Sequence, residues 1–559
     1  FVSLGVVMAA CGGDDDDDDG GGGGDTTTTE AAGDFEGLSF DESAACGTDE
    51  YPGNIATLEA VDELTVTFTL CDPDVAFPAK VAFSAFGIHP SEYIESTGGG
   101  GDLVDSPIGT GPYKLEEWDR GNQLVLTANE DYWGDPAPME TVVFRWSTEA
   151  AQRLVELQSG QVDGIDQVGP EDFATVEGDD SLQLIPRDPL NVFYLGFNVD
   201  RAPFDNETLR QAIGYAINKD RIVDNFYPSA GTDAATQFLP AQIPGNDPDF
   251  EGFAYDQQQA RDLLAQAGFP DGLDLGVLSY RNVFRPYLPQ PPQVASDIRD
   301  QLAQVGLTVQ LDEQESGAFI DNANVGNLSM YMLGWGADYP DATNFMDFHF
   351  GATASPQFGT GFTDIHDVLD EAASLTDPVE RNDLYAQANE LLLEHAPMIP
   401  IAYGGSGVAF KAEVEGAHAS PLSNESFAAM SIEGQDQLVW MQNAEPLGLY
   451  CADETDGESL RACEQINESL LAYEVGGTET VPALAEDFES NEDLTEWTFT
   501  LREGVTFHDG SALDANDVVL SYRMQWDASD PLHVGREALF TYFDAFFGFV
   551  NPPPAEPGG

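Results

Sequence analysis

Four short motifs between residues 107 and 166 constrain the fold of this chain more than any other feature. In order along the chain they read Pro107-Ile108-Gly109-Thr110-Gly111-Pro112-Tyr113, then Trp118, then Asn129-Glu130-Asp131-Tyr132-Trp133-Gly134, and finally Ser159-Gly160-Gln161-Val162-Asp163. Gly109, Gly111 and Pro112 predict a tight turn, because glycine tolerates positive φ and proline fixes φ. Such a turn suits a crossing between two domains, whether or not it also contacts a ligand.

Strand and helix signals alternate through the middle of the chain. Short apolar, β-branched runs predict strands at residues 124–127, 141–144 and 191–198. Apolar spacing and capping residues predict helices over 149–158, 206–224, 256–268 and 377–396. Asp256 and Asp377 are the expected N-caps of the last two. This alternation indicates mixed α/β lobes joined at a hinge.

Length and charge narrow the class of protein. A chain of 559 residues, of which 42% are hydrophobic, can bury several cores, so two or three lobes are expected. No apolar run reaches the ~18 residues that span a bilayer. The net charge of −80, from 100 acidic and 20 basic residues, argues against nucleic acids and other polyanions as partners. Such a charge suits salty surroundings, where dissolved ions screen the repulsion between acidic side chains. A saline habitat is therefore a hypothesis, and it would be supported if the protein stays soluble in molar salt.

The first eleven residues resemble the end of a bacterial lipoprotein signal. An apolar stretch ends in small residues, and Met8-Ala9-Ala10-Cys11 resembles a lipobox. An initiator methionine and a basic region are missing from the sequence, so we expect a truncated gene product. The resemblance implies that Cys11 is lipidated and becomes the first residue of a membrane-anchored protein. The alternative is a hydrophobic N-terminus with a chance cysteine.

A low-complexity segment follows at once. It contains six Asp over 14–19, five Gly over 20–24 and four Thr over 26–29. Such a sequence cannot bury apolar area, and its charges repel one another, so we expect a disordered, extended linker over residues 12–49. We interpret it as a leash between the membrane surface and the folded part. Binding of Ca²⁺ by the acidic run is the alternative role.

Four further cysteines stand at positions 46, 71, 451 and 463. An even number outside the cytoplasm suggests two disulfides, for which three pairings are possible. Closeness in sequence favours Cys46–Cys71 and Cys451–Cys463. A zinc site is the rival, but no CxxC pair occurs and the seven histidines are scattered, so no metal is expected.

The order of the four motifs resembles the extracellular solute-binding proteins of the peptide/nickel ABC importer family (family 5, the dipeptide- and oligopeptide-binding type). The resemblance covers most of residues 50–545. It implies an α/β, two-lobed periplasmic-binding-protein-like fold of cluster C type with an extra small domain. It also implies a monomeric binding protein that is not an enzyme, needs no cofactor and works with permease and ATPase subunits. Its place would be extracytoplasmic, in the periplasm or on the cell surface.

The C-terminal part carries family elements in an unusual order. Residues 438–446 look like the family's first strand and 464–473 like its first helix, and further family elements follow at 481–486, 497–510 and 515–522. In the family these elements precede the 107–166 block, whereas here they come last. The chain is therefore either circularly permuted or the middle of a tandem array. Residues 50–430 and 437–550 together make about one family member with no motif repeated, which favours one permuted unit.

This interpretation divides the chain into six parts: a signal remnant with its lipobox over 1–11, the linker over 12–49, the central and C-terminal part of the fold over 50–430, a join over 431–436, the N-terminal part of the fold over 437–550, and a disordered tail over 551–559.

The candidate ligand site lies in Leu333-Gly334-Trp335-Gly336-Ala337-Asp338-Tyr339-Pro340-Asp341. In peptide-binding family members an Asp of this motif pairs with the ligand's α-amine, and Asp338 matches that position. A desolvated carboxylate facing an ammonium makes charge-assisted hydrogen bonds and selects zwitterions. Gly336 would let a ligand backbone approach, and Trp335 and Tyr339 offer flat walls. The alternative is that Trp335 belongs to the core and Asp338 caps a turn.

Other residues are expected to reach the cleft from elsewhere. The resemblance places Gln442, Asn443 and Glu445 at the end of the family's first strand, where they would line the opposite side, and Tyr403 is a further candidate. His508-Asp509 could suggest a metal or an acid–base pair, but the family puts this segment on a strand and turn away from the cleft. We therefore expect it to be structural.

The function predicted from these features is that of a substrate-binding lipoprotein of an ABC importer. It would capture peptides or peptide-like solutes and deliver them to a membrane permease, with closure driven by contacts that form only in the closed state. One alternative is a protein of the same fold that binds an oligosaccharide, a nickel chelate or an opine. The other, of a different class, is a secreted acidic hydrolase, although no GxSxG, HExxH or P-loop motif occurs.

Overall fold

The computed structural model describes residues 35–48, 51, 53–228, 231–351 and 354–552. The chain divides into two compact units, Phe1–Glu36 and Gly37–Gly559. Every helix and strand of the described residues belongs to the second unit. The predicted lipidation site Cys11, the low-complexity run over 12–34 and residues 553–559 of the predicted tail lie outside the described residues.

A seven-stranded sheet contains segments from both ends of the chain. Its strands, in spatial order, are β4 (Tyr113–Asp119), β5 (Gln123–Ala128), β6 (Thr141–Trp146), β18 (Gln437–Gln442), β7 (Gly164–Ile165), β15 (Ser406–Lys411) and β8 (Leu182–Arg187). β18 runs parallel to both β6 and β7, with Trp440 opposite Phe144 on one side and Gly164 on the other. The apolar run 438–441 fits this central place, because such strands are buried on both faces.

A six-stranded sheet forms the core of the middle of the chain. Its order is β10 (Asp233–Ala234), β14 (Met398–Tyr403), β9 (Asn191–Phe197), β13 (Met330–Gly336), β11 (Leu273–Arg281) and β12 (Leu307–Gln314). Alternate residues of β9 enter two separate cores: Phe193 and Leu195 pack in one, Val192 and Tyr194 in the other.

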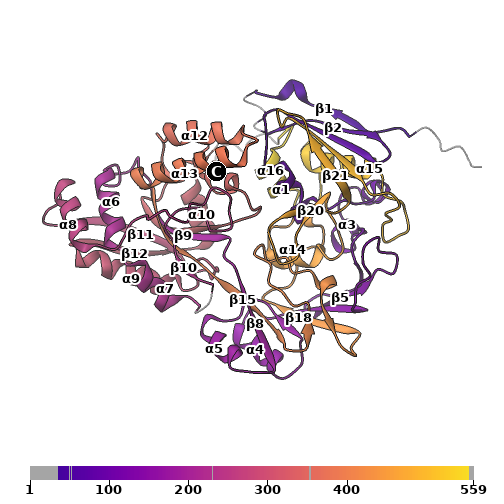
Figure 1. Ribbon diagram of the computed structural model, residues 1–559, viewed down its shortest axis with the longest axis horizontal. Coiled ribbons are helices and arrows are strands. Elements are labelled where there is room, and N and C mark those ends of the chain that lie inside the picture. The colour runs from indigo at the N-terminus through magenta and orange to yellow at the C-terminus, as the bar shows by residue number, and fades with distance from the viewer. Residues whose placement is uncertain (1–34, 49–50, 52, 229–230, 352–353, 553–559) are drawn as a thin grey trace, which may run out of the picture. The chain divides into compact units, whose positions relative to one another are not determined.

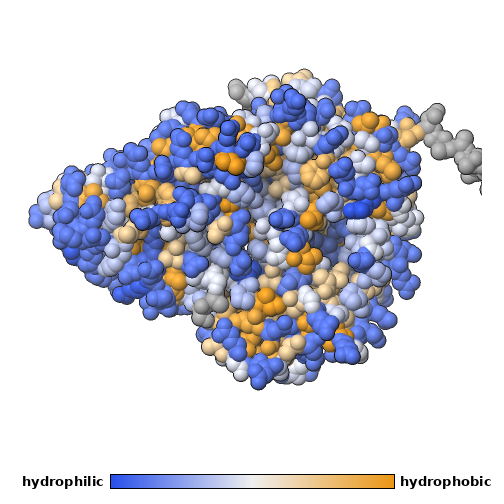
Figure 2. All heavy atoms as spheres, in the orientation of Figure 1, coloured by the Kyte–Doolittle hydropathy of each residue, from blue (hydrophilic) through white to orange (hydrophobic). Residues whose placement is uncertain are grey.

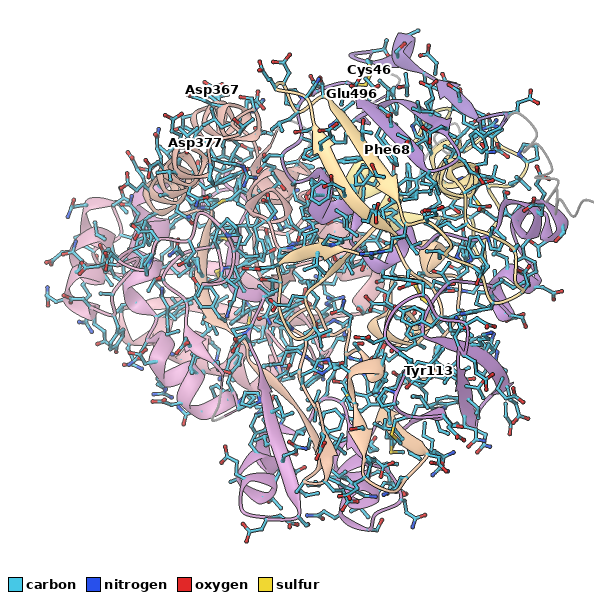
Figure 3. The ribbon with its side chains drawn as sticks, turned by 45° about the vertical axis from the view of Figure 1, so that its right-hand side comes forward. Cys46, Phe68, Tyr113, Asp367, Asp377 and Glu496 are labelled. Carbon is cyan, nitrogen blue, oxygen red and sulfur yellow. A yellow bond between two sulfur atoms is a disulfide. The ribbon has the colours of Figure 1, made fainter. Side chains whose placement is uncertain are left out.

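Helices cover both faces of this sheet (Figure 1). One core includes residues of α6 (Glu207–Ala216), α7 (Lys219–Phe226), α8 (Gln257–Gln266) and α9 (Pro291–Gln304). The other includes residues of α10 (Ser316–Asn324), α11 (Met346–Phe350), α12 (Thr363–Ala373) and α13 (Pro378–His395). Asp377, labelled in Figure 3, caps α13 through the N–H groups of Val379 and Glu380, as the sequence predicts.

A five-stranded sheet again joins the two ends of the chain. Its order is β1 (Ser39–Asp41), β2 (Ile55–Asp62), β3 (Thr65–Leu70), β22 (Glu496–Leu501) and β21 (Ala485–Ser490), so that indigo and yellow strands lie together in Figure 1. β22 is antiparallel to β3, with Trp497 opposite Phe68. Phe68 packs against the rings of Phe77, Phe499 and Tyr522 (Figure 3). Because β1 is a strand, the folded chain begins before the predicted linker boundary at residue 49.

The remaining helices are α1 (Phe77–Val81), α2 (Ser91–Thr97), α3 (Asp102–Asp105), α4 (Ala150–Gln158), α5 (Phe173–Glu177), α14 (Gly457–Cys463), α15 (Ala515–Trp526) and α16 (Thr541–Phe547). Two small hairpins pair β16 (Val414–Glu415) with β17 (Ser431–Ile432), and β19 (Leu471–Tyr473) with β20 (Thr480–Pro482). The face shown in Figure 2 is mostly hydrophilic, in keeping with the 100 acidic residues of the chain.

Two short connections join the seven-stranded sheet to the six-stranded sheet. Residues 188–190 lead from β8 into β9, and residues 404–405 lead from β14 into β15. The Asn191 side chain links the two connections: its Nδ2 donates to the carbonyl of Gly404 at 2.8 Å, and its Oδ1 accepts from the N–H of Gly404 at 2.9 Å. The first lobe therefore comprises residues 37–187 and 406–552, and the second lobe residues 191–403.

Two helix predictions are wrong. The helix expected over 206–224 is two helices, because Ile217 is extended and Asn218 caps α7 by accepting from the N–H of Arg221. The helix expected over 464–473 is displaced: α14 ends at Cys463, and Leu471–Tyr473 forms β19. The second prediction came from the family resemblance; only Leu470 to Tyr473 of this segment form an apolar run, and that run is short enough for a strand.

Candidate ligand-binding site

The turn at Gly109 and Gly111 packs directly on the C-terminal segment. A Cβ at Gly109 would lie 2.2 Å from the carbonyl oxygen of Ile466, and one at Gly111 would lie 2.6 Å from that of Gln465, so neither position has room for a side chain. The N–H of Gly111 donates to Ile466 at 2.8 Å, and the N–H of Tyr113 donates to Gln465 at 3.1 Å. The glycines of the motif therefore serve a close approach of two chain segments.

His508 fastens the same turn. Its Nδ1 accepts from the N–H of Gly109 at 3.4 Å, and its Nε2 lies 3.0 Å from the carbonyl oxygen of Gly111, which assigns the proton to Nε2. Burial lowers the pKa of His508 to about 4, so the ring is neutral. This histidine is structural, and within the described residues no group of three or more His, Cys, Asp or Glu is arranged to hold a metal ion.

A cavity of about 540 Å³ opens beside this turn in the first lobe. Its lining includes Tyr132, Trp133, Asn424, Glu464, Glu468 and Tyr473. Among the described residues that line it, none is Lys, Arg or His. The cavity is thus framed by acidic, amide and aromatic groups.

The two glutamates of this cavity differ in their partners. Glu468 accepts from the Tyr132 hydroxyl and from the Trp133 Nε1–H, both at 2.8 Å, so both of its oxygens are used within the protein. Glu464 accepts from Asn424 Nδ2 at 3.0 Å with Oε1 only, while its buried Oε2 has no partner. Burial raises the pKa of Glu464 to about 7, and the nearby Glu425 charge adds to the rise.

Asp338 stands in the loop after β13, where Asn344 organises it. Asn344 Oδ1 accepts from the Asp338 N–H and from the Trp335 Nε1–H, both at 3.1 Å, and its Nδ2 donates to Asp338 Oδ2 at 3.2 Å. The carboxylate is half-buried, and this burial raises its pKa to about 6. Trp335 is half-buried and stacks on Phe348 at 4.3 Å, while Gly336 is exposed.

Residues of the first lobe meet this loop. The Tyr542 hydroxyl of α16 interacts with the Asp338 carboxylate. Tyr339 packs edge-on against Phe546 of α16 at 4.8 Å, and the Lys80 ammonium lies 5.7 Å from the Tyr339 ring. The two lobes are therefore in contact around Asp338.

A single carboxylate positions the segment that leads into α16. Asp453 accepts from the backbone N–H groups of residues 536–540, at 2.5–2.9 Å. The neighbouring Glu454 makes a two-oxygen pair with Arg536 at 2.7 and 2.8 Å. These contacts fix the start of the helix that carries Tyr542 and Phe546.

Both disulfides of the structure join cysteines that are close in sequence. Cys46 bonds to Cys71, with 5.4 Å between their Cα atoms, and Cys451 bonds to Cys463, with 6.0 Å. The second bond ties the 3₁₀ turn Cys451–Asp453 to the last residue of α14, directly before Glu464. This disulfide therefore links the turn that contains Asp453, which positions α16, to the segment that begins with Glu464, which lines the cavity.

The other residues expected in the site are largely engaged inside the protein. Gln442 is fully buried and donates to the carbonyls of Ala444 and Glu458. Glu445 accepts from the N–H of Gly121, in the turn between β4 and β5. The Tyr403 hydroxyl donates to backbone carbonyls at 2.8 and 3.1 Å. Asn443 is half-buried, and its Oδ1 lacks a partner.

A closed ring of four buried charges, which sequence reasoning missed, lies behind the cavity. Arg187 pairs with Asp166 at 3.0 Å and with Glu425 at 2.6 Å. Arg461 pairs with Asp166 at 2.9 Å and with Glu425 at 2.7 Å. Each of the four side chains is at most 4% exposed. The scarcity of basic residues was the available signal, because a buried Arg in so acidic a chain needs an acidic partner.

A wider hollow of about 690 Å³ lies along β4, and its basic groups are mostly engaged. Arg120 stacks on Trp118 at 3.3 Å and pairs with Asp105 at 2.5 Å, and His508 holds the glycine turn. The other cavity and the Asp338 loop are therefore the candidate ligand site.

Known proteins resemble the chain in both sequence and fold. The family model of the bacterial extracellular solute-binding proteins, family 5 Middle, matches residues 23–357 and 479–537. The chain is 30% identical to heme-binding protein A of Haemophilus influenzae over 394 residues, which cover 69% of this chain and 71% of that protein. It is 31% identical to the dipeptide-binding protein of Escherichia coli over 390 residues, which cover 68% and 72%.

Solved structures agree with the family match. HbpA2 from Haemophilus parasuis has a TM-score of 0.62 at 29% identity, covering 68% of this chain and 76% of that one. A dipeptide-binding protein from Pseudoalteromonas, solved with Met-Leu, has a TM-score of 0.57 at 26% identity, covering 70% and 77%. These likenesses confirm the predicted α/β, two-lobed periplasmic-binding-protein-like fold. In the described residues no helix has the length and apolar character needed to cross a membrane. The chain belongs to the bacterial extracellular solute-binding proteins, family 5, whose members are binding proteins and not enzymes.

Proposed function

We propose that this chain is the substrate-binding lipoprotein of an ABC importer, and that it captures peptides or peptide-like solutes and delivers them to a membrane permease. The observation that carries this proposal is the Asp338 carboxylate, held by Asn344 in a loop where the two lobes meet. Relatives named dipeptide-binding protein support the choice of solute. An ammonium group is the natural partner of a carboxylate withdrawn from water.

Binding and closure follow from the contacts between the lobes. Tyr542 and Phe546 of the first lobe meet Asp338 and Tyr339 of the second. A solute that touches both sides stabilises only the state in which the lobes are together, so its binding energy shifts the hinge equilibrium toward closure. The short connections at 188–190 and 404–405, tied by Asn191, are where we expect the backbone to bend.

A calorimetric titration with free and N-acetylated dipeptides tests the proposal. Acetylation removes the ammonium and leaves the rest of the peptide intact. We expect the free peptide to bind at least ~10-fold more tightly, since a charge-assisted hydrogen bond contributes about 1.5–3 kcal/mol. Equal binding of both forms, or binding of sugars or nickel chelates alone, would overturn the peptide assignment. Turnover of a substrate would revive the hydrolase alternative.

The chain order is proposed to be a circular permutation of one family unit. β18 lies between β6 and β7, and β22 pairs with β3, so the C-terminal segment supplies strands to sheets begun near the other end. The family model also matches in two separate blocks. We expect residues 437–552 alone to be unfolded by circular dichroism and to fold only when co-expressed with residues 37–436. Independent folding of that fragment would favour the tandem array.

Lipid anchoring at Cys11 is proposed from the lipobox-like sequence alone. If Cys11 carries the lipid, the chain fractionates with membranes and a Cys11→Ser variant moves to the aqueous fraction. An unchanged distribution of the variant would contradict the anchor without affecting the solute site.

A further inference from the structure

We propose that the cavity beside Glu464 binds a second cationic group of the ligand, so that the preferred solutes carry two positive charges: one opposite Asp338 and one opposite Glu464. This rests on the proposed function, because it takes Asp338 as the partner of the first ammonium. It adds a specificity subsite and narrows the class of solute to basic peptides or other dicationic molecules.

The first support is the pattern of unused polar atoms. Of the described residues that line the cavity, two have a buried side-chain oxygen or nitrogen without a partner: Glu464 at Oε2, and Asn467 at Oδ1, which packs against Gly109 of the glycine turn. Asn467 is only 3% exposed. Both atoms are acceptors. A buried acceptor without a donor is costly, so the complementary occupant is a group rich in N–H donors.

The second support is the charge of the walls. The lining contains no basic side chain among the described residues, and Glu468 is already satisfied by Tyr132 and Trp133. A ligand carboxylate would meet only carboxylates and acceptor oxygens here. An ammonium or guanidinium would supply the missing donors and a balancing charge, and the aromatic rings would suit its alkyl stem.

The third support is the position of the cavity relative to Asp338. Tyr473 lines the cavity, and the charges of both Glu464 and Asp338 act on it, together with Tyr339. Tyr473 therefore belongs to the surroundings of both carboxylates. We expect a solute that extends past Tyr473 to place one cationic group at each.

Glu464 is also poised to respond to a cation. Burial and the charge of Glu425 raise its pKa to about 7, while Asn424 and the charge of Arg461 act in the opposite direction. A bound cation favours the ionised form. Affinity for the second cationic group should therefore weaken as the pH falls below about 7, where the free protein holds Glu464 protonated.

The test compares dipeptides that contain lysine with counterparts that contain norleucine, which keeps the carbon chain and lacks the ammonium. Titration calorimetry on the full chain at pH 8 should show at least a tenfold preference for the lysine peptides. Glu464→Gln keeps the shape and the Asn424 contact, and it should abolish the preference. Glu479→Gln, an exposed site in the β19–β20 turn that does not line the cavity, is the matched control and should retain it.

Each outcome is decisive. No lysine preference in the wild type, or a preference that survives in Glu464→Gln with an unchanged melting temperature, overturns the second site while leaving peptide binding intact. Tight binding of cadaverine, lost in Glu464→Gln, with no peptide bound, supports the cationic subsite and overturns the peptide function. Failure of every peptide and diamine to bind overturns both.

Discussion

Two sets of buried carboxylates in this protein have opposite fates. In the ring, Asp166 and Glu425 are surrounded by Arg187 and Arg461. Burial raises the pKa of Asp166, but the arginine charges outweigh this effect and lower it to about 2. The pKa of Glu425 is lowered in the same way. At the candidate ligand site, Asp338 and Glu464 have no ion-pair partner among the described residues, and burial raises their pKa values to about 6 and 7. The same residue type is stabilised as an anion in one region and left poised for a cation in the other.

The difference shows how structural carboxylates can be distinguished from candidate ligand-binding carboxylates in a very acidic chain. With 20 basic residues against 100 acidic ones, a buried cation placed beside a carboxylate marks that carboxylate as structural. A carboxylate without a cation can still be structural where N–H or O–H donors fill both of its oxygens, as at Asp453 and Glu468. One that is withdrawn from water and has neither a cation nor a full set of donors is a candidate for pairing with a cation from solution.

The largest effect should come from breaking the ring. Arg461→Met leaves Asp166 and Glu425 buried with one arginine between them, and we expect the free energy of unfolding to fall by about 3–5 kcal/mol. Urea denaturation at pH 7.5 measures this. Arg299→Gln, which removes an exposed pair with Asp300, is the control and should change the stability by less than ~0.5 kcal/mol. A loss below ~1 kcal/mol in Arg461→Met would mean that the ring is not a structural unit.

Removal of the Asp338 charge should weaken binding without weakening the fold. Asp338→Asn keeps the shape and loses the charge, so we expect dipeptide affinity to fall about 10–100-fold, equivalent to about 1.5–3 kcal/mol. Because the pKa of Asp338 is raised in the folded protein, its ionised form is not stabilising, and the variant should be as stable as the wild type at pH 8 or slightly more so. A variant that unfolds readily but binds normally would reverse the assignment of roles.

Local sequence predicted the parts of the molecule that depend on local chemistry. The glycine turn, the strands β5 and β6 that follow it and the cap at Asp377 follow from backbone preferences within a few residues. The motif around Asp338 predicts a ligand-binding role for this residue from its immediate neighbours alone. The break between α6 and α7 was also readable, since Asn218 is a good N-cap, but the continuous apolar spacing concealed it.

The rest depends on which distant segments meet. Glu464 gave no signal in the sequence, because one glutamate among 100 acidic residues is unremarkable until its partners are known. Tyr542 reaches Asp338 from a helix about 200 positions away, through a segment held by Asp453. Gln442 and Tyr403 looked suitable by type and position, yet their polar atoms serve backbone groups inside the lobes. Tertiary packing decides these roles.

The two sets of carboxylates should also make the free energy of unfolding depend on pH in opposite ways. Asp338, Glu464 and Asp347 have pKa values of about 6, 7 and 7, above the unfolded value of ~4, so their contribution is present below ~4 and lost as the pH rises through 6–7. Asp166, at about 2, contributes above ~4 and loses that contribution as the pH falls toward 2. We expect a stability maximum at pH ~4, with stability falling as the pH rises from there toward 7.

Thermal unfolding at pH 5.5 and 8.5 measures this. The melting temperature should be several degrees higher at pH 5.5, because the three raised pKa values together correspond to a difference of about 4–5 kcal/mol in the free energy of unfolding. Asp347→Asn should flatten the slope between the two values. A melting temperature that rises from pH 5.5 to 8.5 would contradict the assignment of unpaired acids to the cleft.

The smallest effect concerns the contact between the lobes at Asp338. Interaction with the Tyr542 hydroxyl lowers the pKa of this carboxyl against the larger effect of burial. Tyr542→Phe removes that interaction and keeps the ring, so the pKa of Asp338 should rise above about 6. The pH at which dipeptide binding is half lost should move upward by a few tenths of a unit, whereas Tyr215→Phe, in α6 of the second lobe, should leave it unchanged. Calorimetric titrations between pH 5 and 8 resolve such a shift. A downward shift would show that the hydroxyl favours the protonated carboxyl, and an unchanged value would show that in the free protein Asp338 is held by its own lobe and not by α16.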